Sequence, residues 1–138
     1  MEERGVRIAV VVVDLFAAVS AIAGALGLVV GYMNIPPSVL QGSAFADFTV
    51  PALLLGVVVG GSALVAAAIA LFGPRRLETL ATAAAGCIMV GWIAIEVAMI
   101  GLGSWLQPAY FAVGLLMIGL AGLLHQARAG AAVRRRVA

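Results

Sequence analysis

The sequence predicts an all-α membrane protein, specifically a bundle of four transmembrane helices. The 138 residues are 64% hydrophobic and 10% charged, with a mean hydropathy of +1.20, whereas soluble domains carry about 25% charged residues. So little polar surface suits lipid as a solvent better than water. All eight basic residues are arginines, and they lie in three short patches between long apolar runs. We expect residues 1–138 to form a single transmembrane domain.

Four apolar runs predict the helices: residues 8–33, 50–72, 77–103 and 108–127. Each is close to or longer than the roughly 20 residues that a helix needs to cross the hydrocarbon core. Within lipid each segment must pair its own backbone amides, which requires a helix. Barrel strands are not expected, because the runs are continuously apolar and do not alternate between apolar and polar residues. The first run could instead be a signal peptide ending near Ala21-Ile22-Ala23. A span is the preferred interpretation, because the apolar run continues about ten residues further.

The connections contain residues that end or start helices. Residues 34–49 form the longest connection, and they combine Pro36-Pro37 and Gly42 with several apolar side chains. Gly73-Pro74 separates the second span from the third, in a tight turn. Pro51 and Pro108 lie near the starts of spans, where a missing N–H has little cost. Residues 128–138 form a basic tail.

The arginines predict the orientation. Four spans bring both termini and the Gly73–Thr79 connection to one side, and every arginine lies there. By the positive-inside rule this side is cytoplasmic. The opposite boundary has an aromatic group of Tyr32, Trp105, Tyr110 and Phe111. Five arginines are interpreted as topology signals and contacts for lipid headgroups: Arg75, Arg76, Arg134, Arg135 and Arg136.

The predicted location is the plasma membrane of a bacterium or archaeon, with several spans and both termini cytoplasmic. The chain contains no lysine and is rich in alanine, glycine, valine and arginine, which is typical of a GC-rich genome. The arginines flank apolar segments and do not cover one face of a folded domain. We therefore expect the lipid bilayer to be a partner, and nucleic acid not to be one.

Small residues at helical spacing predict where helices pack closely. The candidates are Ser20, Gly24, Gly27 and Gly31 in the first span, Gly56 and Gly60 in the second, and Gly91 in the third. Gly27–Gly31 and Gly56–Gly60 match the GxxxG pattern, which allows near backbone contact. Packing within one bundle is the preferred interpretation. Association of several copies, or with another membrane protein, is the alternative.

Two acids inside spans are the candidate functional residues, because a charge in hydrocarbon must pair, become protonated or face a cavity. Asp14 lies about two helical turns into the first span. A structural role for Asp14, as an ion pair with Arg7 or an arginine of the turn or as a hydrogen bond, is as well supported as a functional one. Glu96 has no basic residue in its half of the bilayer. Its candidate neighbours are Trp92, Met99 and Tyr110. We expect Glu96 to be a site for a proton, a cation or a ligand.

Other chemistry has little support in the sequence. Nucleophile motifs, phosphate-binding glycine loops and dinucleotide fingerprints are missing from it. The only cysteine, Cys87, allows no intramolecular disulfide and no cysteine-based metal site. His125 is interpreted as a residue at the membrane boundary. We expect no catalytic residues, no metal and no cofactor.

The preferred interpretation is a non-catalytic accessory or partner-binding helix bundle. One alternative is a small proton- or cation-coupled transporter or channel that uses Glu96, with Asp14 as a second acid. The other is a lipid-binding protein in which residues 34–49 act as a lid.

Two patterns concern the whole chain. Spans one and two resemble spans three and four, since Pro51-Ala52 and Pro108-Ala109 start equivalent helices, which would make a 2+2 parallel repeat. Residues 34–40, 56–63 and 91–108 resemble uncharacterised four-span membrane proteins of actinobacteria and related lineages. That resemblance implies four helices in a bacterial plasma membrane, and it transfers no activity.

Overall fold

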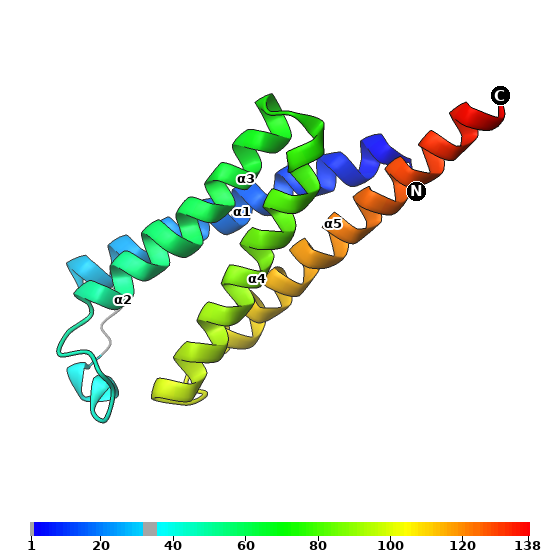
Figure 1. The fold of residues 1–138 in the computed structure, drawn as a ribbon. Coiled ribbons are helices and arrows are strands. Elements are labelled where there is room, and N and C mark those ends of the chain that lie inside the picture. The colour runs from blue at the N-terminus through cyan, green and yellow to red at the C-terminus, as the bar shows by residue number, and fades with distance from the viewer. Residues whose placement is uncertain (1, 32–35) are drawn as a thin grey trace.

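The computed structural model describes residues 2–31 and 36–138, and every regular element in these two segments is a helix. The first long helix is α1 (Glu3–Val30), and the second is built from α2 (Thr49–Leu53), η2 (Leu54–Gly60) and α3 (Gly61–Phe72). The third is α4 (Arg75–Ile100), the fourth is α5 (Leu106–Val137), and a short 3-10 helix, η1 (Pro37–Leu40), lies between α1 and α2 (Figure 1). All four are long and apolar enough to cross a membrane, which confirms the predicted helical class.

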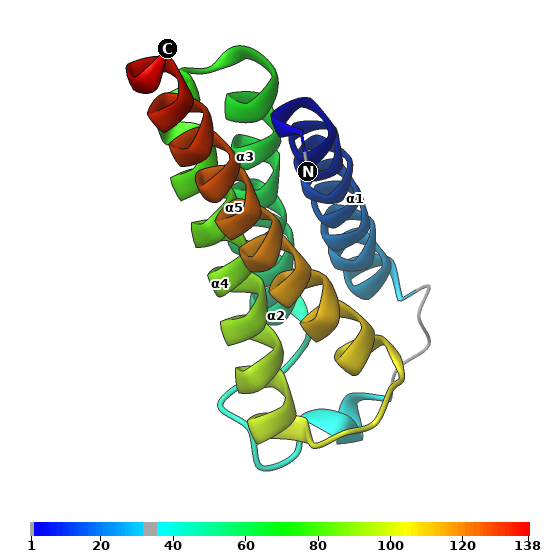
Figure 2. The same ribbon diagram turned by 90° about the vertical axis from the view of Figure 1, so that its right-hand side faces the viewer.

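The helices form a ring in which each packs on two neighbours. The second helix lies between α1 and α4, and α5 lies between α4 and α1. Both termini and the α3–α4 turn lie at one end of the bundle (Figure 2). We call this the arginine end, and we call the opposite end, with residues 36–48 and 101–105, the loop end.

The helices extend further at the arginine end than the apolar runs indicated. α1 begins at Glu3, five residues before the predicted start, and α5 continues to Val137 through the segment predicted to be a tail. Alanine and arginine are good helix formers, and arginines in a last turn interact favourably with the helix dipole. At the loop end, α4 stops at Ile100 because Gly101 has a positive φ of 75°. Tyr32, Met33 and the start of the 34–49 connection lie outside the described residues.

The second helix contains a π-helical segment, η2, between α2 and α3. A π-helix has a wider turn than an α-helix and is often found at functional sites. Leu55 and Val59 belong to η2, and both side chains line the cavity described below.

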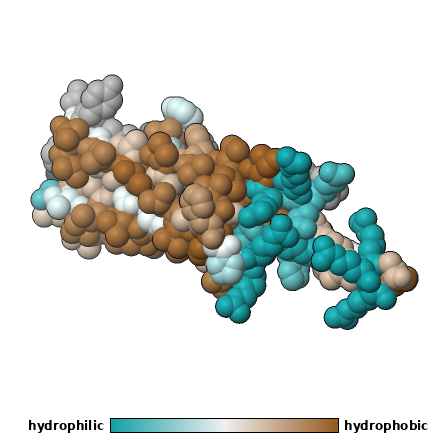
Figure 3. Space-filling model, turned by 90° about the horizontal axis from the view of Figure 1, so that it is seen from above, coloured by the Kyte–Doolittle hydropathy of each residue, from teal (hydrophilic) through white to brown (hydrophobic). Residues whose placement is uncertain are grey.

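The interior is built from small side chains, and large apolar ones face outward. The main core cluster contains six alanines together with Val59, Met89 and Met117. Large apolar residues are exposed on the outer helix faces, for example Val19 and Leu80 at 66% each. The outer surface is accordingly apolar along most of the molecule and hydrophilic at the arginine end (Figure 3).

Two glycine pairs lie at close helix contacts. A Cβ on Gly56 would lie 2.9 Å from the Ala25 Cβ, and one on Gly60 would lie 2.9 Å from the Ile22 Cγ1. This pair brings η2 against α1. A Cβ on Gly86 would lie 2.8 Å from the Gly114 carbonyl oxygen, where α4 crosses α5.

The structure corrects two of the predicted packing glycines. A Cβ on Gly91 would have no atom within 4 Å, so this glycine is not at a contact within the bundle. Gly31 likewise has open space, and its φ of 72° ends α1 in the left-handed conformation that favours glycine. Of the remaining predicted residues, Gly24 touches Leu55 and Gly27 is buried. Ser20 donates its hydroxyl to the Phe16 carbonyl within α1.

Candidate functional site

The loop end contains a cavity of about 220 Å³ enclosed by α1, η2, α4, α5 and the connection between α1 and α2. Most of its walls are apolar or aromatic. Its polar groups come from α1, α4, α5 and the short α4–α5 turn: Ser20, Trp92, Glu96, Ser104, Gln107 and Tyr110. Trp92, Met99 and Tyr110, the predicted neighbours of Glu96, all line this cavity.

The Glu96 carboxylate is held by a buried amide. Gln107 is 3% exposed, and its Nε2 donates to the Glu96 Oε1 at 3.1 Å and to the Gly101 carbonyl at 3.2 Å. The Gln107 Oε1 accepts the Gly103 amide N–H at 3.0 Å. Both ends of the amide are therefore occupied, which sets its orientation and that of the carboxylate beside it.

The turn after α4 makes this arrangement possible. Gly101 adopts a positive φ, so the chain turns sharply and α5 begins at Leu106, a few residues later. Gln107 then lies in the first turn of α5, beside the last turns of α4. The sequence analysis did not single out Gln107, although a polar residue next to Pro108 at a span boundary was a usable signal.

The second carboxylate oxygen of Glu96 receives no hydrogen bond from any residue in the described segments. Within those segments Glu96 also takes part in no ion pair, and each of the ion-paired arginines lies at the arginine end. The Trp92 Nε1, one α-helical turn before Glu96, is buried and lacks an acceptor among the same residues. Glu96 thus keeps one carboxylate oxygen as an acceptor for a ligand in the cavity, and the Trp92 N–H is a donor without a partner beside it.

The connection between α1 and α2 covers one side of the cavity. Leu40 is buried, and Phe45 and Phe48 also line the cavity wall. The Ser43 hydroxyl accepts the Phe45 N–H at 3.2 Å and donates to the Leu40 carbonyl at 2.7 Å. Gly42, with a φ of 83°, allows the tight turn between them. This local network holds the two aromatic rings over the bundle.

On the side toward the middle of the bundle, the cavity is bounded by the packed core. Ala21, Val59 and Met89 line the cavity and also belong to the main core cluster. Below them the interior is filled mainly by alanine methyl groups and Met117. The cavity therefore ends at this core and extends from it toward the loop end.

Asp14 lies in a different part of the bundle from Glu96. It is fully buried, and its Oδ2 accepts the Thr82 hydroxyl at 2.8 Å across the bundle from α4. Thr82 and Glu96 are separated by about 21 Å of α4, given the helix rise. Of the two structural alternatives for Asp14, the structure has the hydrogen bond and not the ion pair with Arg7, because Arg7 binds Glu78 instead.

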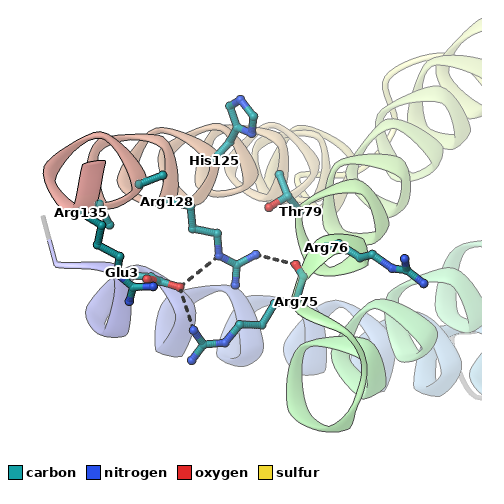
Figure 4. A pocket seen from close by; sticks show the side chains of 9 residues that line it. Glu3, Arg75, Arg76, Thr79, His125, Arg128 and Arg135 are labelled. Carbon is teal, nitrogen blue, oxygen red and sulfur yellow. Dashed lines mark hydrogen bonds and ion pairs between the residues drawn. The ribbon is translucent and has the colours of Figure 1, made fainter. Parts of the chain in front are cut away.

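Glu78 is a buried acid that the sequence analysis left among the residues of the α3–α4 turn. It is fully buried at the arginine end, between Arg7 at 3.1 Å and Arg128. Arg128 also donates to the Glu3 carboxylate at 3.1 Å and to the Arg75 carbonyl at 2.7 Å (Figure 4). Arg7 donates to the Ala70 carbonyl at 2.7 Å. These bonds tie together the ends of α1, α3, α4 and α5.

His125 lines a second cavity at this end, together with several of the arginines. Within residues 2–31 and 36–138, no group of three or more His, Cys, Asp or Glu side chains could hold a metal ion. Cys87 is an exposed free thiol on α4.

Comparison of the chain with protein-family models, curated proteins and solved structures gave no match. The resemblance to four-span actinobacterial proteins therefore stays a prediction, and the function has to be argued from the geometry alone.

Proposed function

We propose that this chain is a multi-pass plasma-membrane protein that binds a hydrophobic cation in the loop-end cavity. In this proposal the arginine end faces the cytoplasm and the cavity opens outward. The observation that carries it is the free carboxylate oxygen of Glu96 in an apolar, aromatic pocket.

The charge of the pocket favours a cation. An ionised carboxylate in apolar surroundings is costly unless a positive charge accompanies it. Among the described residues that line the cavity, Glu96 alone is charged, so a bound cation would neutralise it. An anionic ligand would add a second negative charge and is disfavoured.

The walls favour a cation with an apolar body. Trp92 and Tyr110 stand beside Glu96, and Phe45 and Phe48 face the cavity from the connection. Aromatic faces attract ammonium groups, most strongly where water is excluded. The unpartnered Trp92 Nε1 would in addition donate its N–H to an acceptor on the ligand, such as a carbonyl or ether oxygen.

Binding has more support than conduction. The packed alanine core separates the cavity from the arginine end, so passage of an ion would require a second conformation. Phe45 and Phe48 act as the lid of the pocket in this proposal, since they line it from the connection between α1 and α2, outside the four long helices.

The test is binding of benzyltrimethylammonium to the protein in nanodiscs, with empty discs as the background. Neopentylbenzene, which has the same shape without the charge, is the matched ligand. The chain has two tryptophans, so Trp105→Phe leaves Trp92 as the fluorescent reporter. We expect Glu96→Gln to weaken binding of the cation by about tenfold or more, equivalent to about 1.4 kcal/mol, and to leave the neutral ligand unaffected.

The matched control variant is Asp47→Asn. It removes one negative charge at the same end, from a residue that lies outside the cavity and accepts the Thr49 N–H. Equal binding of both ligands, with no effect of Glu96→Gln, would identify the cavity as a site for an uncharged lipid chain and contradict the proposal. An equal loss of cation binding in Glu96→Gln and Asp47→Asn would show that surface charge at this end, and not the Glu96 carboxylate in the cavity, attracts the cation.

A second candidate function, an accessory bundle for another membrane protein, is favoured by one face of α4. Ala84, Cys87, Ala94 and Ala98 are exposed and Gly91 has open space around it, so a partner helix could approach closely. Purification of the native protein in mild detergent would then recover a stoichiometric partner. The same purification of the Gly91→Leu variant would recover the chain without that partner.

A further inference from the structure

The arginine end contains a cavity of about 340 Å³ between the first turns of α4 and the last turns of α5. It is separate from the loop-end pocket and shares no lining residue with it. Its walls combine several arginines with the Thr79 hydroxyl and the His125 ring, and Figure 4 shows these side chains.

The charges around this cavity do not balance. Five arginines (Arg7, Arg75, Arg76, Arg128 and Arg135) line it or join its ion pairs, against only Glu3 and Glu78. Both glutamates are already bound by arginines, and Glu78 is fully buried. About three positive charges therefore remain without an internal counter-charge.

The arginines divide into a structural and an available group. Arg128 uses three of its N–H groups on Glu3, Glu78 and the Arg75 carbonyl, and its side chain is 21% exposed. The Arg75 side chain is 66% exposed, and its guanidinium forms one ion pair with the described residues, to Glu3 at 3.8 Å. Arg135 makes no ion pair or side-chain hydrogen bond with the described residues, and it reaches from α5 toward the cavity, whereas Arg76 points away (Figure 4).

We propose that this cavity binds a phosphate group, held by Arg75 and Arg135. A guanidinium presents paired N–H donors that match phosphate oxygens, and two of them on opposite walls would neutralise the anion. Thr79 and His125 add donors between the two helices. The small side chains of Ala131 and Ala132 leave the room that the cavity occupies.

A lipid headgroup is the favoured source of the phosphate. The cavity lies at the arginine end, where the surface changes from apolar to hydrophilic (Figure 3). This change marks the level of headgroups for a helix bundle in a bilayer. Basic pockets between transmembrane helices on the cytoplasmic side bind anionic headgroups in this way. Free phosphate has the same chemistry, so the experiment has to separate the two sources.

The experiment titrates phosphatidylglycerol, and separately phosphatidylcholine, into the full chain in uncharged detergent and counts bound lipids by native mass spectrometry. A parallel titration adds inorganic phosphate without lipid. Arg75→Gln and Arg135→Gln are compared with Arg4→Gln and Arg4→Ala, which remove the same charge at the same end from an exposed residue that does not line the cavity. We expect the first pair to weaken binding roughly fivefold and the second pair to have little effect.

The outcomes are distinct. Preferential binding of phosphatidylglycerol that depends on Arg75 and Arg135 supports a headgroup site. Binding of inorganic phosphate with the same dependence supports a site for a free phosphate compound. If all four variants weaken binding equally, the arginines attract anions only as a diffuse charge, and the proposal is overturned. A thermal melt of each variant shows whether it is folded, and the conservative Arg135→Lys serves in place of an unfolded Arg135→Gln.

Discussion

Glu78 illustrates how much the role of a single side chain depends on its neighbours. It has no exposed surface, and its two carboxylate oxygens are bound by Arg7 from α1 and Arg128 from α5. A buried carboxylate with opposite charges on both sides is stable, but removing one member of such a group leaves uncompensated charge. Glu78 is therefore the centre of the polar contacts at the arginine end.

Replacing Glu78 by glutamine should destabilise the protein strongly. We expect a loss of about 3 kcal/mol in the free energy of unfolding, because Arg7 and Arg128 would lose their shared counter-charge. The measurement is unfolding of the protein in mixed micelles by increasing sodium dodecyl sulfate. Glu3→Gln is the matched control. Its carboxylate is 31% exposed, so a loss below about 1 kcal/mol is expected. Similar losses in the two variants would refute the central role of Glu78.

The roles of Asp14 and Glu96 also depend on their neighbours, and the two acids end in different environments. Asp14 is fully buried against Thr82 and lines neither of the two cavities described above, whereas Glu96 lines a pocket and has one oxygen free. Both are acids in apolar runs, and the sequence favoured Glu96 as a site only because its half of the bilayer has no basic residue. Their partners, Thr82 and Gln107, are distant in the chain or lie beyond a turn.

At the scale of helices, the closest crossing is that of α4 and α5 at Gly86 and Gly114. A Cβ on Gly86 would meet the Gly114 carbonyl oxygen at 2.8 Å and the Met117 Cβ at 3.0 Å. Neither atom is at the end of a flexible side chain, so the backbones would have to separate. The predicted contact at Gly91 is five residues further along α4, on a different side of the helix, and that side is open.

Gly86→Val should therefore loosen the bundle, while Gly91→Val should not. We expect a loss of about 2 kcal/mol or more for Gly86→Val because of overpacking. For Gly91→Val we expect a change within about 0.5 kcal/mol. Both lie in the same helix and both replace glycine by the same residue, so helix propensity cancels. The midpoint of thermal unfolding in detergent measures the difference, and equal midpoints would contradict the assigned crossing.

At the scale of the molecule, the two ends of the bundle differ in chemistry. The arginine end concentrates ion pairs and unbalanced positive charge, and the loop end concentrates aromatic rings and one acid. This asymmetry gives the molecule a direction along its axis. It also places the two proposed binding sites at opposite ends, with a packed alanine core between them.

We predict that the arginine end is cytoplasmic, which cysteine labelling tests. In a Cys87→Ala background, Ala46→Cys reports the loop end and Ala138→Cys reports the arginine end, both at exposed positions. An impermeant maleimide applied to intact cells should label Ala46→Cys, and it should label Ala138→Cys only after lysis, as the positive-inside rule requires. The reverse pattern would invert the orientation, and labelling of both in intact cells would contradict the four-span topology.

The sequence by itself determined the helical class, the number of long helices and the apolar surface, because these follow from composition and run length. It also indicated Glu96 and its neighbours Trp92, Met99 and Tyr110. The 2+2 repeat, the membrane location and the absence of catalysis stay predictions.

Only the tertiary structure decided the partner of each polar side chain and the face that each helix turns inward. Apolar runs of alanine, glycine, valine and leucine have no polar stripe, so their periodicity does not distinguish a packed face from an open one, as Gly86 and Gly91 demonstrate. Contacts such as Arg7–Glu78, Asp14–Thr82 and Arg128–Glu78 join residues far apart in the chain. Their formation depends on how the helices cross and rotate, which local sequence does not encode.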